Sequence, residues 1–290
     1  MSLPTRFSIA AARTASTLLL VAAWLAGCAG PAAGPAGQGG PNSGSSGEGG
    51  GAPTAAAAPS PSDAASADRR ARVRLELAAL YFSRGQNSTA LDELKLALAA
   101  SPDLPEAHSL RGLVYASLGQ PVVAEEAFRR ALTLSPSDGD TMHNFGWFLC
   151  QQRRYDEAEE IFLRATALPN YGEQQRTLLA RGVCMARAGR WAESEKVLSR
   201  SYELDPANPV AAYNLSDVLL RRGELERARF YVRRINQVPE QVTAQSLWLA
   251  ARIERRLGNM EGVQDFGRQL RDRFPQSPES LQFERGRFDD

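Results

Sequence analysis

Histidine and cysteine are the residues in this sequence whose chemistry could serve catalysis or metal binding at neutral pH. A cysteine beside a histidine could form a nucleophile and base, and both residue types ligate zinc. The two histidines, His108 and His143, have no carboxylate or cysteine at helical ligand spacing beside them. The sequence therefore predicts a protein that is not an enzyme and has no metal site, no cofactor and no small-molecule substrate.

Two of the three cysteines, Cys150 and Cys184, fall at similar places in consecutive repeats. An oxidising compartment would permit a disulfide between them, since the helices that carry them are expected to lie side by side. Their positions within the repeat differ by two, however, which directs the two side chains to different helix faces. We therefore expect buried free thiols.

The third cysteine, Cys28, ends a segment with the features of an export signal. Arg6 and Arg13 precede an apolar run over residues 15–26, and the run leads into the letters LAGC, with Cys28 last. The run is too short for a membrane span, and a polar tract follows it. The segment is thus a signal peptide, and small residues stand at the expected cut.

The LAGC letters resemble the lipobox of bacterial lipoproteins; the alternative is an ordinary secretory signal with an incidental cysteine. The resemblance implies that the Cys28 thiol takes a diacylglycerol, that residues 1–27 are removed, and that the new amine is acylated, for example with palmitate. Each buried methylene of such chains contributes about 0.8 kcal/mol to membrane binding. Ala29 stands where aspartate would retain the protein at the inner membrane. We therefore expect a lipid anchor at the periplasmic face of the outer membrane.

The charge balance predicts no nucleic-acid partner, and the composition separates a tether from the rest of the chain. The 290 residues carry 34 basic and 33 acidic side chains, which are mixed rather than blocked. Residues 29–68 are almost wholly Gly, Ala, Pro and Ser, with nothing to bury. We predict a disordered tether over residues 28–70, with a reach of roughly 35 Å.

A 34-residue period fills most of the remaining sequence. Six units cover residues 71–277, at about 71–104, 105–138, 139–174, 175–208, 209–243 and 244–277, and a C-terminal tail follows over 278–290. Each unit contains two amphipathic stretches. We count positions from the first residue of each unit. This is the period of the tetratricopeptide repeat, which the sequence resembles.

Small and large residues recur at fixed positions of these units. The eighth position holds Ala78, Gly112, Gly146, Gly182, Ser216 and Ala251, and the twenty-fourth holds Leu94, Phe128, Phe162, Leu198, Val232 and Gly267. Small residues let the two helices of a unit approach closely. The implied fold class is all-α: a right-handed superhelical tetratricopeptide-repeat solenoid of six repeats, with a concave groove lined by the first helix of each unit. Units five and six keep the pattern less well, as terminal repeats do.

In this repeat family, positions two, five, nine, twelve and thirteen usually face the groove. The candidate protein-binding residues at these positions are Leu75, Ala79, Phe82, Leu113, Ala116, His143, Trp147, Cys150, Gln151, Tyr213 and Trp248, with arginines at Arg176, Arg187, Arg221, Arg252 and Arg256. Apolar anchors, tryptophan and arginine are typical of peptide-binding surfaces. The alternative is that individual members pack against neighbouring units or are simply solvated.

A stretch of unit three resembles one particular family of tetratricopeptide-repeat proteins more closely than the repeat pattern alone requires. The stretch from His143 to Cys150, followed by the letters RYDEA, is similar to a segment of the PilW/PilF type of type IV pilus biogenesis lipoproteins. The insertion LPNYGEQ and the later FPQSPESLQF extend the match. The resemblance implies a pilotin, a non-catalytic adaptor that binds secretin subunits and promotes their localisation and multimerisation in the outer membrane. The alternatives are a lipoprotein scaffold for peptidoglycan enzymes, or an assembly factor of another secretion or tight-adherence pilus system.

Overall fold

The computed structural model describes residues 61–288, so the signal peptide, Cys28 and the tether up to residue 60 lie outside the described part. Within residues 61–288 every regular element is a helix. The helices are α1 (Pro61–Ser83), α2 (Asn87–Ala100), α3 (Pro105–Ser117), α4 (Pro121–Leu134), α5 (Gly139–Gln151), α6 (Tyr155–Thr166), α7 (Gln174–Arg187), α8 (Trp191–Leu204), α9 (Pro209–Arg221), α10 (Leu225–Asn236), α11 (Ala244–Arg256), α12 (Met260–Arg273) and α13 (Pro278–Glu284).

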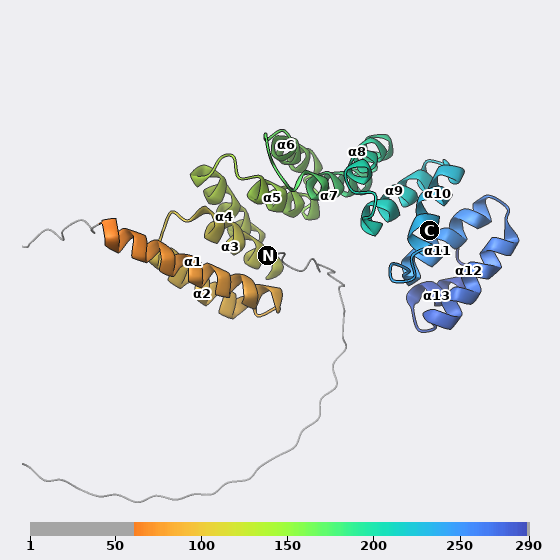
Figure 1. The fold of residues 1–290 in the computed structure, drawn as a ribbon, viewed down its shortest axis with the longest axis horizontal. Helices are drawn as coiled ribbons and strands as arrows, with labels where there is room; N and C mark the ends of the chain where they lie inside the picture. The colour runs from red at the N-terminus through yellow and green to blue at the C-terminus, as the bar shows by residue number, and fades with distance from the viewer. Residues whose placement is uncertain (1–60, 289–290) are drawn as a thin grey trace, which may run out of the picture. The chain divides into compact units, whose positions relative to one another are not determined.

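Consecutive helices pair into the six units that the sequence predicts. The first helices are α1, α3, α5, α7, α9 and α11, and each packs against the helix that follows it. Figure 1 shows the pairs succeeding one another in chain order, from α1 and α2 at one end to α12 and α13 at the other. The predicted tetratricopeptide-repeat solenoid is thus confirmed. One boundary was wrong, because α1 begins at Pro61 and makes residues 61–70 of the predicted tether helical.

The small eighth position fits closely against the large twenty-fourth position of the same unit. A Cβ atom added at Gly146 would lie 2.8 Å from the ring of Phe162, and one at Gly182 would lie 2.6 Å from the side chain of Leu198. Both distances are shorter than van der Waals contact, so glycine sets the separation of the paired helices. The packing role predicted for these positions is confirmed.

The turn inside each unit needs a left-handed backbone. Gly85, Gly119, Gly189, Gly223 and Gly258 have φ between +70° and +78°. Glycine adopts this conformation without the Cβ clash that other residues suffer. Unit three places Arg153 there instead, at φ +62°.

The first helices form the inner side of the array. Each contacts the first helix of the next unit, from α1 with α3 through to α9 with α11. Among the described residues, the second helices of adjacent units make no such contacts. Helices on the inner side of a curve lie closer together than those on the outer side, so the first helices line the concave face.

The end of the chain forms an additional helix that covers the last unit. Pro278, at the start of α13, follows Ala244 by 34 residues, and α13 packs against α11 and α12 as the first helix of a seventh unit would. Its Phe283 ring occupies the space beside Gly267, where any added Cβ atom would overlap it. The predicted tail over 278–290 is therefore largely a capping helix, and Gly267 is small because Phe283 supplies the missing bulk.

The described residues form neither a membrane-spanning helix nor a cluster of metal ligands. Over residues 61–288 no helix has the length and apolar character needed to cross a membrane. In the same range no cluster of three or more His, Cys, Asp or Glu residues is placed to hold a metal ion.

Candidate binding groove

Units one and two carry apolar side chains on the concave face. Leu75 and Phe82 are half-buried and pack against the core of unit one, while Ala79 between them is exposed. Leu113 and Ala116 are half-buried beside the core cluster that contains Phe128 and its neighbours. Four of these five predicted residues thus combine a packing role with a surface left partly open to a ligand, and Ala79 is exposed without packing against the core.

Trp147 of α5 is the aromatic centre of the concave face. Its ring is half-buried, and the guanidinium carbon of Arg187, from α7 in the next unit, lies 4.8 Å from the ring centroid. A guanidinium at this distance is attracted to the indole face. Gln151, one turn further along α5, is exposed. The structure therefore brings Trp147, Arg187 and Gln151 to neighbouring places on two first helices.

His143 lies between units three and four rather than in open groove. Its Nδ1 atom is 3.0 Å from the Thr177 hydroxyl oxygen, and its ring meets Phe162 edge-on with centroids 6.3 Å apart. Burial, with a smaller effect from the positive charge of Arg176, lowers the pKa of His143 to about 3. The imidazole is therefore neutral at physiological pH and acts as a packing and hydrogen-bonding group.

The insertion between units three and four supplies a residue that the sequence did not single out. Tyr171 packs over Gly139, where an added Cβ would lie 2.6 Å from its ring. Its hydroxyl lies 3.1 Å from the Thr177 hydroxyl and donates to Asp140 at 3.3 Å. Burial raises the pKa of the Tyr171 phenol. The insertion thus connects α5 to α7. The only hint of this contact in the sequence was the glycine at the start of unit three, Gly139, which leaves room for the Tyr171 ring.

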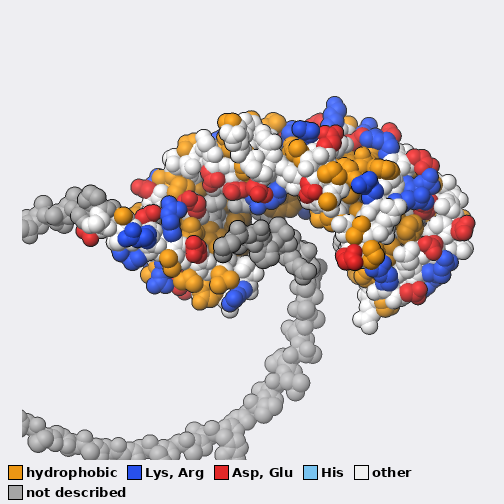
Figure 2. Space-filling model, in the orientation of Figure 1, with side chains coloured by type: hydrophobic (Ala, Val, Ile, Leu, Met, Phe, Trp, Pro, Cys, Tyr) orange, Lys and Arg blue, Asp and Glu red, His pale blue; other side chains and the backbone are white. Residues whose placement is uncertain are grey.

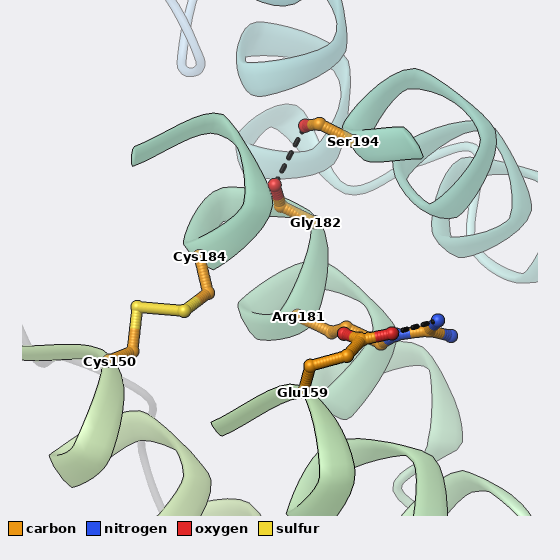
Figure 3. Close-up of a disulfide and its surroundings, with 6 residues drawn as sticks. All are labelled: Cys150, Glu159, Arg181, Gly182, Cys184 and Ser194. Carbon is orange, nitrogen blue, oxygen red and sulfur yellow. Dashed lines mark hydrogen bonds and ion pairs between the residues drawn. A yellow bond between two sulfur atoms is a disulfide. The ribbon is translucent and has the colours of Figure 1, made fainter. Parts of the chain in front are cut away.

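Cys150 and Cys184 are joined by a disulfide, so the prediction of free thiols was wrong (Figure 3). Their Cα atoms lie 5.8 Å apart, and both side chains are buried. Neighbouring helices that run side by side meet through opposite faces. The offset of two positions therefore allows the bridge, because Cys150 uses the face of α5 toward the next unit and Cys184 the face of α7 toward the preceding one. Cys150 is consequently not an accessible groove residue.

Trp248 is also unavailable to a ligand. Only 8% of it is exposed, because the rings of Phe288 and Phe283 cover it at centroid distances of 4.9 and 6.4 Å. The Arg255 guanidinium carbon lies 4.3 Å from the Phe288 ring centroid on top of this stack. The sequence placed Trp248 in the groove because it did not anticipate α13. Tyr213, also predicted for the groove, is half-buried in the core of unit five.

Several arginines of the predicted basic end are paired. Arg176 donates to Asp140 at 3.0 Å. Arg221 donates to Asp217 at 2.9 Å and lies over the ring of Trp191. These pairs offset much of the positive charge that the sequence suggested for the C-terminal half of the groove.

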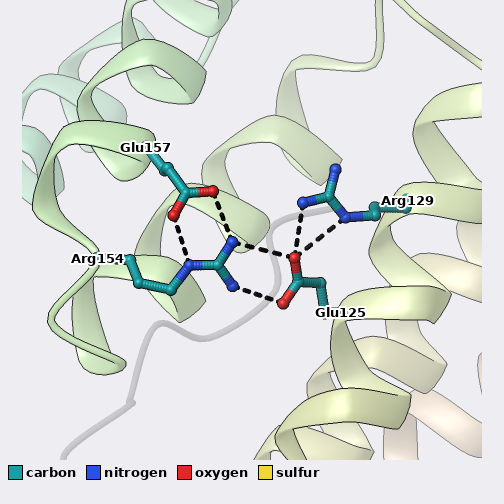
Figure 4. A network of polar contacts seen from close by, with 4 residues as sticks. All are labelled: Glu125, Arg129, Arg154 and Glu157. Carbon is teal, nitrogen blue, oxygen red and sulfur yellow. Dashed lines mark hydrogen bonds and ion pairs between the residues drawn. The ribbon is translucent and has the colours of Figure 1, made fainter.

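Ion pairs between neighbouring units couple successive repeats. Arg154 of unit three contacts Glu125 of unit two at 2.5 Å and also pairs with Glu157, and Glu125 in turn accepts from Arg129 (Figure 4). Arg154 is the main reason that the pKa of Glu125 lies below its ordinary value. In the next interface, Arg181 makes a bidentate pair with Glu159 (Figure 3). The units therefore hold a defined relative placement.

At the interface between units five and six, the later unit supplies the acid and the earlier unit supplies the arginines, the reverse of the pairs described above. Glu254 occupies the eleventh position of unit six, where the other units have large apolar side chains, and is 1% exposed. Its carboxylate pairs with Arg233 at 3.0 Å and with Arg229 at 3.5 Å, and accepts a hydrogen bond from Asn259. A buried charge needs such partners. The departure of unit six from the repeat pattern is therefore a satisfied polar substitution.

Comparison with family models supports the repeat reading along the chain. A TPR repeat model matches residues 78–119, and tetratricopeptide repeat models match residues 105–138, 146–209 and 185–253. Together they match residues 78–138 and 146–253, which fall in all six units.

Related proteins and solved structures point to one group within the tetratricopeptide-repeat proteins. The type IV pilus assembly protein PilF of Pseudomonas aeruginosa is 28% identical over 210 residues, which is 72% of this chain and 83% of PilF. A crystal structure of PilW, described as a widely conserved type IV pilus biogenesis factor, superposes with a TM-score of 0.68 at 29% identity and covers 73% of this chain and 96% of PilW. The chain belongs to the PilF/PilW type of type IV pilus biogenesis proteins. A solved structure of P. aeruginosa PilF gives a TM-score of 0.67 at 25% identity and is covered over 100% of its length.

An uncharacterised protein of Haemophilus influenzae is 30% identical over 138 residues, or 47% of this chain and 75% of that protein. The PilF/PilW assignment confirms the family that the unit-three stretch predicts. As a tetratricopeptide-repeat protein of this type, the chain offers its helical surfaces for protein–protein interaction.

Proposed function

We propose that this PilF/PilW-type chain is a pilotin, a non-catalytic adaptor that binds secretin subunits on its concave face and promotes their outer-membrane localisation and multimerisation. The observation that carries the proposal is the half-open apolar and aromatic surface of units one to three. Leu75, Phe82, Leu113 and Trp147 each keep part of their surface exposed on adjoining first helices. Apolar anchors on a preformed helical scaffold suit a short peptide segment of a partner.

The binding surface lies in units one to three because the other end is occupied. Trp248 of unit six is covered by α13, and Arg176 and Arg221 of units four and five are paired with carboxylates. A partner segment with two or three apolar side chains would bury these residues without having to displace any of those contacts. Trp147 at the centre, with Arg187 over its ring, is the expected hot spot.

Location is a separate part of the proposal and rests on the sequence. Cys28 would carry the acyl chains that hold the protein at the periplasmic face of the outer membrane. The Gly/Ala/Pro/Ser segment that follows would give the repeats reach of roughly 35 Å from the lipid surface.

Binding of purified secretin to immobilised mature protein tests the recognition step. We expect Trp147→Ala and Leu75→Glu each to weaken binding at least tenfold, because they remove an aromatic anchor and place a charge among apolar groups. Leu163→Glu is the matched control, since Leu163 is 45% exposed on α6, a second helix on the outer side. Its affinity should stay within twofold of wild type.

Two results would contradict the recognition step. Wild-type affinity in both groove variants, with unchanged helical content, would move the site to the outer face. Recovery of peptidoglycan enzymes without secretin from detergent-solubilised envelope would favour the scaffold alternative.

The anchor is tested by fractionation. Cys28→Ala should shift the protein from outer-membrane fractions to the soluble periplasmic fraction while its circular dichroism spectrum stays the same. Retention of Cys28→Ala in the outer membrane would refute acylation as the anchor.

A further inference from the structure

In units two to six, one face of the first helix packs against the preceding unit. This face carries positions three, seven and ten of the unit, and in units two to six it packs against the second helix of the unit before. Positions three and ten are at most 3% exposed in all five of these units: Ala107, Val114, Thr141, Phe148, Thr177, Cys184, Ala211, Val218, Ser246 and Ile253. This face is therefore buried in every unit that follows another unit.

The same face of α1 is apolar and open. Its position-three and position-ten residues, Val73 and Leu80, are 57% and 44% exposed, and Leu77 between them is half-buried. The spacing 73, 77, 80 places the three side chains in one stripe along the helix. A terminal repeat normally presents polar residues outward. The far end of the array is covered by α13, whereas the α1 face has no such cover among the described residues and keeps the residue types of an internal unit.

Positive charge borders this stripe. Arg70 and Arg84 lie seven residues on either side of Leu77, in line with the stripe, and Arg69 flanks it. Against these three arginines stand two carboxylates on the same side of the helix, that of Glu76 and that of Asp63, which lies seven residues before Arg70 near the start of α1. Figure 2 shows hydrophobic side chains next to basic and acidic ones over the α1–α2 end of the described residues. A ligand for this face should therefore be apolar in the middle and acidic at both ends.

These charges argue against two occupants. A second copy that packed α1 against α1 in the antiparallel sense would place Arg70 opposite Arg84, and the parallel sense would place each arginine opposite itself; like charges repel in both arrangements. The chain's own preceding residues, 29–60, contain no Val, Leu, Ile, Met or aromatic residue and a single acid, Glu48. Neither occupant supplies both apolar bulk and negative charge.

We infer that the α1 face over Val73, Leu77 and Leu80 docks an acidic amphipathic helix of a partner protein, which takes the place that a second helix occupies against every other first helix. This surface is distinct from the concave groove. It would let one molecule hold the concave-face ligand and a helical partner at the same time.

The chain itself provides matched probes. The α6 sequence, YDEAEEIFLRAT, packs against the equivalent face of α7 and carries four acids and one arginine, a net charge of −3. The α10 sequence, LERARFYVRRIN, packs against the same face of α11 and carries one acid and four arginines, a net charge of +3. Both are twelve-residue second helices, so they differ mainly in charge. Each would be synthesised with a lactam staple on its solvent face, since short isolated helices are marginal in water.

Fluorescence anisotropy with the mature chain then tests the inference. We expect the α6 peptide to bind at least tenfold more tightly than the α10 peptide. Val73→Glu/Leu80→Glu should weaken α6 binding at least tenfold, and Arg70→Glu/Arg84→Glu should invert the preference between the peptides. Val122→Glu, at a 69% exposed apolar residue on α4, is the matched control and should bind within twofold of wild type.

Three outcomes would overturn the inference: equal binding of the two peptides, α6 binding that survives Val73→Glu/Leu80→Glu, or dimers in sedimentation velocity that this double variant abolishes. The charge-reversal variant changes exposed arginines, so it gives an answer even if the Glu pair reduces stability. Trp147→Ala should leave peptide binding unchanged, which separates this surface from the proposed secretin site.

Discussion

Removal of the Cys150–Cys184 disulfide should destabilise the fold by a calculable amount. The bridge closes a loop with a sequence separation of 34 residues. The loop-closure relation for a loop of this length gives about 3.8 kcal/mol of stability at 25 °C, because the cross-link restricts the unfolded chain. The bridge also joins α5 to α7 at the middle of the array, so its loss should affect units three and four first.

Urea unfolding followed by far-ultraviolet circular dichroism measures this effect. The Cys150→Ser/Cys184→Ser variant should lose about 3 to 4 kcal/mol relative to the oxidised wild type. Reduced wild type serves as the control that changes the bond without changing the sequence, and it should match the variant closely. Reductant should have no effect on the variant.

A loss below about 1 kcal/mol, both in the variant and on reduction, would refute the loop-closure reasoning. It would mean that the packing of units three and four already restricts the chain as strongly as the bridge does. A loss in the variant without a loss on reduction would assign the effect to the serine hydroxyls in a buried site.

The remaining predictions concern burial. The pKa of His143 is about 3 in the folded chain and about 6.5 when unfolded, so the unfolded chain binds the proton first and stability falls below pH 6.5, by about 2 kcal/mol at pH 5; His143→Gln should remove this slope in urea titrations. Gly182→Ala should cost about 1 to 3 kcal/mol in thermal or urea unfolding, because its Cβ would press on Leu198. Phe283→Ala should expose Trp248, shift its fluorescence emission to the red and cost about 2 kcal/mol.

Each of these has an outcome that contradicts it. An unchanged pH slope in His143→Gln would assign the slope to other groups, of which His108, whose pKa burial also lowers, is the first to examine. A stable Gly182→Ala would show that α7 and α8 can separate freely. Blue-shifted or unchanged emission in Phe283→Ala would mean that α13 does not cover Trp248 in solution; Leu281→Ala, at an exposed residue of α13, is the control.

The repeat architecture could be predicted from the sequence because it depends on local period and residue size. The 34-residue spacing, the small residue at position eight as in Gly146, and the left-handed glycines such as Gly85 all describe contacts within one unit. Six copies repeat the same signals, so each position is effectively observed several times. The PilF/PilW resemblance likewise rests on a continuous stretch of unit three.

The candidate site was harder to predict from the sequence, because the exposure of its side chains depends on contacts between units. Trp147 and Gln151 keep an open surface, whereas Cys150, on the same helix, is buried in a bridge to α7. Counting positions along one helix cannot show that side-by-side helices meet through different faces. Trp248 has the same position in its unit as Leu75, which keeps part of its surface open, but the residues that cover Trp248 come from α13.

The sequence by itself thus determined the helices, their pairing and the family, because short-range periodicity and backbone conformation are written in adjacent residues. Only the tertiary structure decided which inward positions remain accessible, that the two cysteines meet, and that α13 closes one end while α1 leaves the other open. Those outcomes depend on how whole units stack, and stacking is set by surfaces that come together from distant parts of the chain.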